Sequence, residues 1–80
     1  MRATVLIRPK GGILDPQGEA VGQSLRKLGF DVHMARVGRV VDLELEADDA
    51  EAARREITRM CEELLANALI ESFEIELEGS

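Results

Sequence analysis

The chain has 80 residues, which is enough for one small domain with a single core. Its 16 Asp and Glu residues outnumber its 10 Lys and Arg residues, and the resulting formal net charge of −6 argues against sequence-independent binding to nucleic acid. Two Phe residues, without any Tyr or Trp, leave no aromatic platform for stacked bases, so we expect a single domain over residues 1–80 that binds no nucleic acid.

The first predicted element is a strand over residues 2–8, where apolar and polar side chains alternate. No signal peptide is visible before it, and no apolar run in the chain approaches the length of a membrane span. We therefore expect a cytoplasmic protein without membrane contacts.

A helix is predicted next, after a break at residues 9–12. Asp15 is a good N-cap, and Pro16 fills the first helical position, where its missing N–H is no loss. Gly29 suits the position just past the helix end. Three apolar residues of this helix recur at helical spacing and are expected to face the core. They are Val21, Leu25 and Leu28.

Two further strands are predicted over residues 32–37 and 41–46. Gly38 lies between them and is expected to supply the positive φ that a tight hairpin needs. His33 lies in the first of these strands, on the face expected to point away from the helices. We interpret it as a surface or interface histidine.

The second predicted helix begins at residues 48–51, which have the spacing of a capping box with an Asp cap, and it ends near Ala66. Asn67 is expected to end this helix in a left-handed conformation. Apolar residues then alternate over residues 73–77 and predict the last strand. The residues expected to face inward from the helix are Ala53, Ile57, Met60 and Leu64.

These elements follow one another in the order β-α-β-β-α-β. This order predicts an α+β, ferredoxin-like fold, in which a four-stranded antiparallel sheet of strand order 4-1-3-2 carries two helices on one face. The first strand would then lie between the third and the fourth. Its basic residues Arg2 and Arg8 would stand among acidic side chains of the neighbouring strands.

No constellation of catalytic or metal-binding residues is evident, because the hydroxyl side chains lie on different elements and the chain has one His and one Cys. Cys61 lies beside the apolar stripe of the second helix, and we interpret it as a small hydrophobe. Residues 8–12 could hold an anion at a helix start, but Asp15 would place a carboxylate there, so a flexible connector is preferred. We expect no catalytic, cofactor or metal site on this chain.

Three segments stand in a telling order and spacing. They are residues 14–18 (LDPQG), residues 36–39 (RVGR), and residues 60–67 (MCEELLAN) with Ile70 and Glu71 after them. Together they make the chain similar, over nearly its whole length, to the PurS family, the small subunit of bacterial and archaeal formylglycinamide ribonucleotide amidotransferase. The family usually has proline, lysine and an aromatic hydroxyl where this chain has Ala68, Arg39 and Phe73.

The resemblance implies a subunit that has no active site of its own and binds no cofactor. In the fourth step of de novo purine synthesis, the complex uses ATP, Mg²⁺ and glutamine to convert formylglycinamide ribonucleotide to formylglycinamidine ribonucleotide. The implied partners are further copies, in a homodimer or tetramer, a synthetase subunit of PurL type and a glutaminase subunit of PurQ type. The chain would bridge the last two so that ammonia is not lost.

The candidate interface lies in the first two of these segments. Arg36 and Arg39 flank the predicted turn and are basic in an acidic chain, so we expect them to dock a partner subunit. The full candidate set is Arg36, Gly38, Arg39, Asp15, Pro16, Gln17 and Gly18.

An amino-acid-binding regulatory module of the ACT type is the alternative, because it uses the same order of elements. Gly38 and the helix starts could then line an amino-acid site between two copies. Calorimetric titration separates the two hypotheses, since a regulatory module should bind an amino acid alone, whereas a PurS subunit should need its partner subunits.

Overall fold

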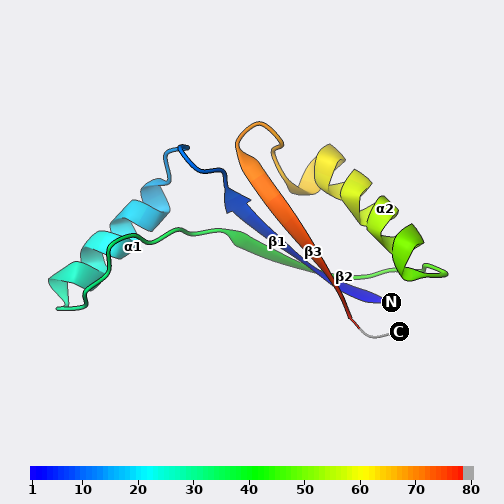
Figure 1. The fold of residues 1–80 in the computed structure, drawn as a ribbon, viewed down its shortest axis with the longest axis horizontal. Helices are drawn as coiled ribbons and strands as arrows, with labels where there is room; N and C mark the ends of the chain where they lie inside the picture. Colours follow the sequence, from blue (N-terminus) through cyan, green and yellow to red (C-terminus); the bar gives the residue numbers. More distant parts are fainter. Residues whose placement is uncertain (79–80) are drawn as a thin grey trace.

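The computed structural model describes residues 1–78, and within this range the chain forms three strands and two helices (Figure 1). A π-helical turn, η1 (Cys61–Leu65), continues the second helix. The elements in chain order are β1 (Arg2–Pro9), α1 (Pro16–Lys27), β2 (Arg39–Glu44), α2 (Ala50–Met60) and β3 (Glu71–Glu78).

The strands form one antiparallel sheet in the order β2-β1-β3. The predicted four-stranded ferredoxin-like sheet is therefore wrong, because residues 32–37 form no strand. These residues run back along α1 (Figure 1), where the Arg26 guanidinium donates a hydrogen bond to the Val32 carbonyl at 3.0 Å. Apolar residues alternate in any extended segment that packs one of its sides against another element. The alternation therefore does not require that the segment pair with a strand.

The central position of β1 is confirmed, since β1 pairs with β2 on one side and with β3 on the other. Its basic residues meet acidic ones on both neighbours, as predicted. Arg2 lies 4.0 Å from Glu44, and Arg8 lies 2.9 Å from Glu74. These pairs are exposed, so each contributes at most about 1 kcal/mol. These pairs are therefore evidence for the strand order and contribute little to the stability of the sheet.

Both helices begin at an aspartate. Asp15 is the predicted cap of α1, whereas α2 is capped by Asp49, one residue after the Asp48 that the capping-box spacing to Glu51 implies. The Asp15 carboxylate accepts a hydrogen bond from the Gly18 N–H at 3.0 Å, and the Asp49 carboxylate accepts one from the Ala52 N–H at 2.7 Å. The end of α1 is also confirmed, because Gly29 has a φ of +99° just past the helix.

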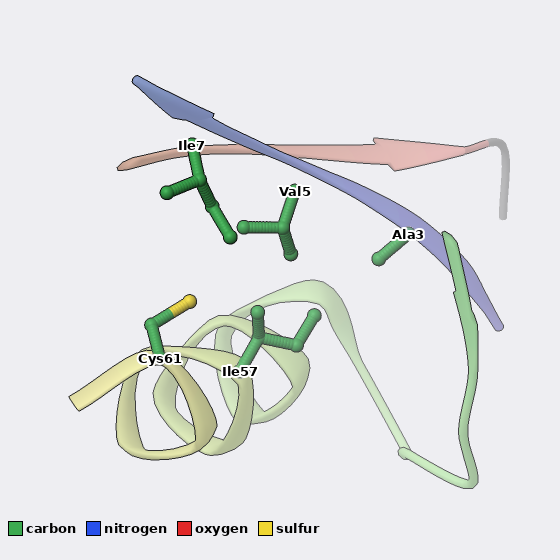
Figure 2. Close-up of a cluster of buried hydrophobic side chains, with 5 residues drawn as sticks. All are labelled: Ala3, Val5, Ile7, Ile57 and Cys61. Atoms are coloured by element: carbon green, nitrogen blue, oxygen red, sulfur yellow. The ribbon is translucent and has the colours of Figure 1, made fainter. Parts of the chain in front are cut away.

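The core lies between one face of the sheet and α2 (Figure 2). Three side chains of β1 project toward two side chains of the helix, and all five are almost fully buried. The inward orientation of Ile57 and the interpretation of Cys61 as a small hydrophobe are confirmed. The five residues are Ala3, Val5, Ile7, Ile57 and Cys61.

The π-helical turn changes which leucine faces the core. The Ala66 N–H donates to the Cys61 carbonyl at 3.0 Å, so this last turn is wider than an α-helical one. The residue one π-turn after buried Cys61 is therefore Leu65, which packs against the core, while Leu64 is 83% exposed. The predicted inward position of Leu64 is wrong. The left-handed end at Asn67 is wrong too, because no non-glycine residue in the described range has positive φ.

Helix α1 and the returning residues 28–38, together called the arm, project away from the sheet (Figure 1). The molecule is correspondingly elongated, with a radius of gyration of 15.7 Å, whereas a compact domain of this length has about 12 Å. The prediction of two helices on one sheet face is therefore wrong. Val21 and Leu28, expected in the core, are 42% and 73% exposed. The apolar side of α1 is left without a cover in the single chain.

Gly38 is needed for a close approach and not for a left-handed turn. Among the glycines of the described range, only Gly12 and Gly29 have positive φ, so the predicted positive φ at Gly38 is wrong. A Cβ added to Gly38 would instead collide with the Ile7 carbonyl oxygen of β1. Absence of a side chain lets the end of the arm reach the sheet.

Replacement of Gly38 by valine is expected to lower the free energy of unfolding by about 1–3 kcal/mol, because the new side chain forces β2 away from β1. A thermal melt of the variant and the parent protein measures the effect. Gly11→Val is the matched control, since a Cβ at Gly11 meets nothing within 4 Å. Equal melting temperatures for the two variants would contradict the close approach.

Candidate interface at the root of the arm

Asp15 joins the two predicted interface segments at the root of the arm. Besides capping α1 through Gly18, its carboxylate accepts a hydrogen bond from the Val37 N–H at 3.0 Å. These two N–H groups, that of Val37 first, hold the pKa of Asp15 below its ordinary value of 3.8, and the charge of Arg36 adds a smaller effect. The sequence predicted the cap, but it gave no sign of the contact to Val37.

Gly18 allows the returning segment to lie directly against α1. It is buried, and an added Cβ would clash with the Asp15 carboxylate and lie 2.5 Å from the Ala35 carbonyl oxygen. Pro16 and Gln17 are exposed. Within this segment, Asp15 and Gly18 therefore build the root of the arm, while Pro16 and Gln17 are accessible to another molecule.

Arg36 brings a positive charge to the same root. Its guanidinium donates a hydrogen bond to the Pro9 carbonyl at the end of β1. The side chain is exposed, and it forms no ion pair with the residues that the structure describes. Arg36 therefore presents at the root of the arm a positive charge that can meet a carboxylate of a partner.

Arg39 belongs to a separate arrangement, which we call the clamp and which comprises Arg39, Leu65, Asn67 and Glu71. The Arg39 Nη1 and Nη2 donate to the Glu71 carboxylate at 2.7 and 3.1 Å, and Nη2 also donates to the Leu65 carbonyl at 2.7 Å. The Asn67 N–H donates to Glu71 at 2.8 Å. The Arg39 side chain and then this N–H lower the pKa of Glu71. Arg39 thus fastens the end of η1 to β2 and β3.

Glu71 is the residue of this region to which the sequence assigned no role. It lies 32 positions from Arg39, and helical or strand periodicity relates residues within one element only. The sheet register would have found the pair, because Arg39 stands opposite Ile7 and Glu71 opposite Pro9 on the same central strand.

The chemistry of this region is that of contact surfaces. Within residues 1–78, no group of three His, Cys, Asp or Glu side chains is placed to hold a metal ion. Burial, followed by the charge of Glu62, raises the pKa of the Cys61 thiol and disfavours its nucleophilic thiolate form. His33 is exposed on the arm. Neither described helix is long and apolar enough to cross a bilayer.

Stability is expected to fall in acid through Asp15 and Glu71. The pKa of each carboxyl is lowered in the folded chain from ordinary values of 3.8 and 4.5, so the unfolded chain binds more protons as the pH decreases through this range. The stabilisation is present above about pH 5 and is lost as the pH falls through the folded-state pKa values.

Urea denaturation near pH 6 and near about pH 3.5 measures this loss. The double variant Asp15→Asn with Glu71→Gln should be less stable at the higher pH and should change less between the two. If its loss in acid equals that of the parent protein, other carboxyls are responsible.

The chain matches one family model over residues 2–79, described as PurS: Phosphoribosylformylglycinamidine (FGAM) synthase. The phosphoribosylformylglycinamidine synthase subunit PurS of Archaeoglobus fulgidus is 45% identical over 76 residues, which cover 94% of this chain and 95% of that protein. The subunit of the same name from Synechocystis is 42% identical over 77 residues, covering 95% of this chain and 75% of that protein.

Solved structures agree with the sequence matches. The crystal structure of PurS from Methanocaldococcus jannaschii, one of the subunits of formylglycinamide ribonucleotide amidotransferase, superposes with a TM-score of 0.86 at 36% identity, covering 96% of this chain and 94% of that one. A chain in the structure of PurLQS from Thermotoga maritima gives a TM-score of 0.87 at 32% identity, covering 94% of this chain and 93% of that one. The likeness therefore extends over the sheet and the arm together.

Proposed function

This chain belongs to the PurS family, and we propose that it joins a glutaminase subunit to a synthetase subunit within phosphoribosylformylglycinamidine synthase. It is a subunit of this ligase in purine biosynthesis, and its partners are of the PurL and PurQ types. The observation that carries this function is the near-complete superposition on a chain of the PurLQS structure.

The bridge has a chemical purpose. We propose that glutamine is hydrolysed on one partner and that the ammonia is used on the other, where formylglycinamide ribonucleotide is amidated at the expense of ATP. Ammonia released into water would be diluted and protonated, so a subunit that holds the two sites together preserves it. We also propose that the complex uses ATP and Mg²⁺, that this chain binds no cofactor, and that the complex lies in the cytoplasm.

A second copy of the chain is the proposed cover for the arm. Both outer strands of the described sheet, β2 and β3, have one unpaired edge, and a chain this short buries a modest share of its surface alone. We therefore propose a homodimer or tetramer. Light scattering at micromolar concentration should show at least a dimer, and a monomer would contradict it. The exposed apolar residues of the arm are Val21, Leu28, Phe30 and Met34.

Reconstitution with the synthetase and glutaminase subunits tests the bridging function. Glutamine-dependent formation of formylglycinamidine ribonucleotide should require this chain. Full glutamine-dependent activity without it would overturn the proposal.

Arg36 tests which part of the chain docks a partner. Arg36→Glu should raise the amount of chain needed for half-maximal activity, because reversal places like charges in the contact. Arg55→Glu is the control, since Arg55 is an exposed arginine on α2 and its reversal changes the net charge equally. Arg39 is left unchanged because its reversal would break the clamp. Equal requirements for the two variants would exclude Arg36 from the docking surface.

A further inference from the structure

Leu64 and Leu69 are the most exposed large apolar side chains in the described part of the chain, at 83% and 84%. They line one shallow hollow of about 710 Å³ together with Ile70, which is 42% exposed. We call these three residues the leucine surface. It comprises Leu64 of η1 and two residues of the loop between η1 and β3, which is drawn in orange in Figure 1. Apolar side chains gathered in this way on a small protein mark an interaction site.

The loop that carries Leu69 and Ile70 is held rigidly. The clamp fixes both of its ends, and the Asn67 Oδ1 accepts a hydrogen bond from the Leu69 N–H at 3.1 Å. On its other side, the Lys10 ammonium donates to the Ala68 carbonyl at 2.7 Å, and the Lys10 N–H donates to the Ile70 carbonyl at 2.8 Å. These hydrogen bonds keep Leu69 directed away from the core, whereas Leu64 belongs to η1 and not to the loop. The loop also loses little conformational entropy when a partner binds.

The outward position of Leu64 follows from the π-helical turn. A regular α-helix would place Leu64 beside Ile57 and Cys61, whereas the wider turn gives that inward place to Leu65. π-helical turns occur frequently at functional sites. The core is therefore closed by one leucine while the adjacent leucine is presented to solvent.

The charge at the rim opposes a face-to-face contact between two copies of this surface. Glu62 lines the same hollow and forms no ion pair with any residue in the described range. A second copy docked through the same surface about a two-fold axis would bring two Glu62 carboxylates together, which is unfavourable. A different chain with basic side chains around an apolar centre would meet complementary charge.

We propose that the leucine surface docks one of the two partner subunits, through apolar side chains of that subunit flanked by Lys or Arg. This inference rests on the proposed function, and it names a surface separate from the root of the arm. The partner's apolar side chains enter the hollow between Leu64 and Leu69, and a basic side chain of the partner pairs with Glu62.

The test uses the three-subunit enzyme. Leu64→Gln with Leu69→Gln keeps the side-chain size, removes the apolar surface and leaves the core untouched. The concentration of this chain that gives half-maximal glutamine-dependent activity should rise at least tenfold, with little change in activity at saturation. Glu62→Arg, a second exposed variant, should raise it as well. Leu14→Gln is the matched control, because Leu14 is an exposed leucine outside both the leucine surface and the apolar residues of the arm that are assigned to a second copy. It should leave that concentration unchanged.

Thermal melts, light scattering and pairwise binding to each isolated partner accompany these assays. Unchanged melting and oligomer size, with binding to one partner weakened, support the proposal and identify that partner. A smaller oligomer for the leucine variant assigns the surface to a second copy and overturns it. If the leucine variant and the Glu62 variant both need the same chain concentration as the parent protein, and the enzyme still depends on this chain, the leucine surface is not a docking site. The bridging function then stands. Full glutamine-dependent activity without this chain would overturn the bridging function itself.

Discussion

Ile57→Ala is expected to lower the free energy of unfolding by about 2–5 kcal/mol, the largest effect of any single side-chain truncation in α2. Ile57 is fully buried and faces Val5 and Ile7 across the one layer of core in the chain (Figure 2). A chain of this length has a total stability of roughly 4–12 kcal/mol, so the loss is a large share of the total. Urea denaturation followed by circular dichroism measures the change.

The neighbouring leucines supply the controls for this experiment. Leu64→Ala removes a side chain that is 83% exposed and should change the free energy of unfolding by less than about 0.5 kcal/mol. Leu65→Ala removes one that packs against the core and should be clearly destabilising. A larger loss of stability for Leu64→Ala than for Leu65→Ala would show that the helix stays α-helical to its end and that the π-helical turn is wrong.

Gly18→Ala should destabilise the arm by about 2–4 kcal/mol, because it combines overpacking with loss of a helix cap. The added methyl would lie 2.5 Å from the Ala35 carbonyl oxygen and would also clash with the Asp15 carboxylate. Asp15 would then have to leave the Gly18 N–H, and its bond to Val37 would be lost as well. Hydrogen exchange should show faster exchange throughout the arm and little change in the sheet.

Gly22→Ala is the matched control on the same helix. A methyl at Gly22 lies 3.3 Å from the Arg26 guanidinium, which is the end of a flexible side chain, and makes ordinary contact with Ala35. Removal of a helical glycine contributes about 0.5–1 kcal/mol in favour of the helix, so this variant should equal or exceed the parent protein in stability. Equal losses at Gly18 and Gly22 would mean that the returning segment does not pack on α1.

Much of the fold could be predicted because it depends on local patterns. Asp15, Asp49 and Gly29 mark helix boundaries through backbone geometry within a few residues, and the strands over β1 and β3 alternate cleanly. Two local predictions failed, the positive φ at Gly38 and the left-handed end at Asn67. The failed prediction of a four-stranded sheet depends instead on which element lies beside a segment. The segment 32–37 alternates like a strand, yet its neighbour is a helix.

The candidate interface was also predicted only in part. The sequence marked Asp15 and Arg36 as members of two segments, and the structure brings them to one place, because the arm folds back on itself over about one helix length. Arg39 stood in the same short segment as Arg36, but its guanidinium reaches Glu71 and the end of η1. Two arginines three positions apart thus have different roles, and only the sheet register separates them.

The central position of β1 has a consequence for the newly made protein. β1 leaves the ribosome before β2 and β3, yet β3 is one of its two neighbours, and Arg2 stands opposite Glu78. Synthesis proceeds at about 5–20 residues per second, so β1 waits several seconds with at least one edge open. During that time its Val5 and Ile7 are exposed to other nascent chains. A transcript truncated before residue 71 should therefore yield aggregated or degraded product, even though both helices and β2 would be complete.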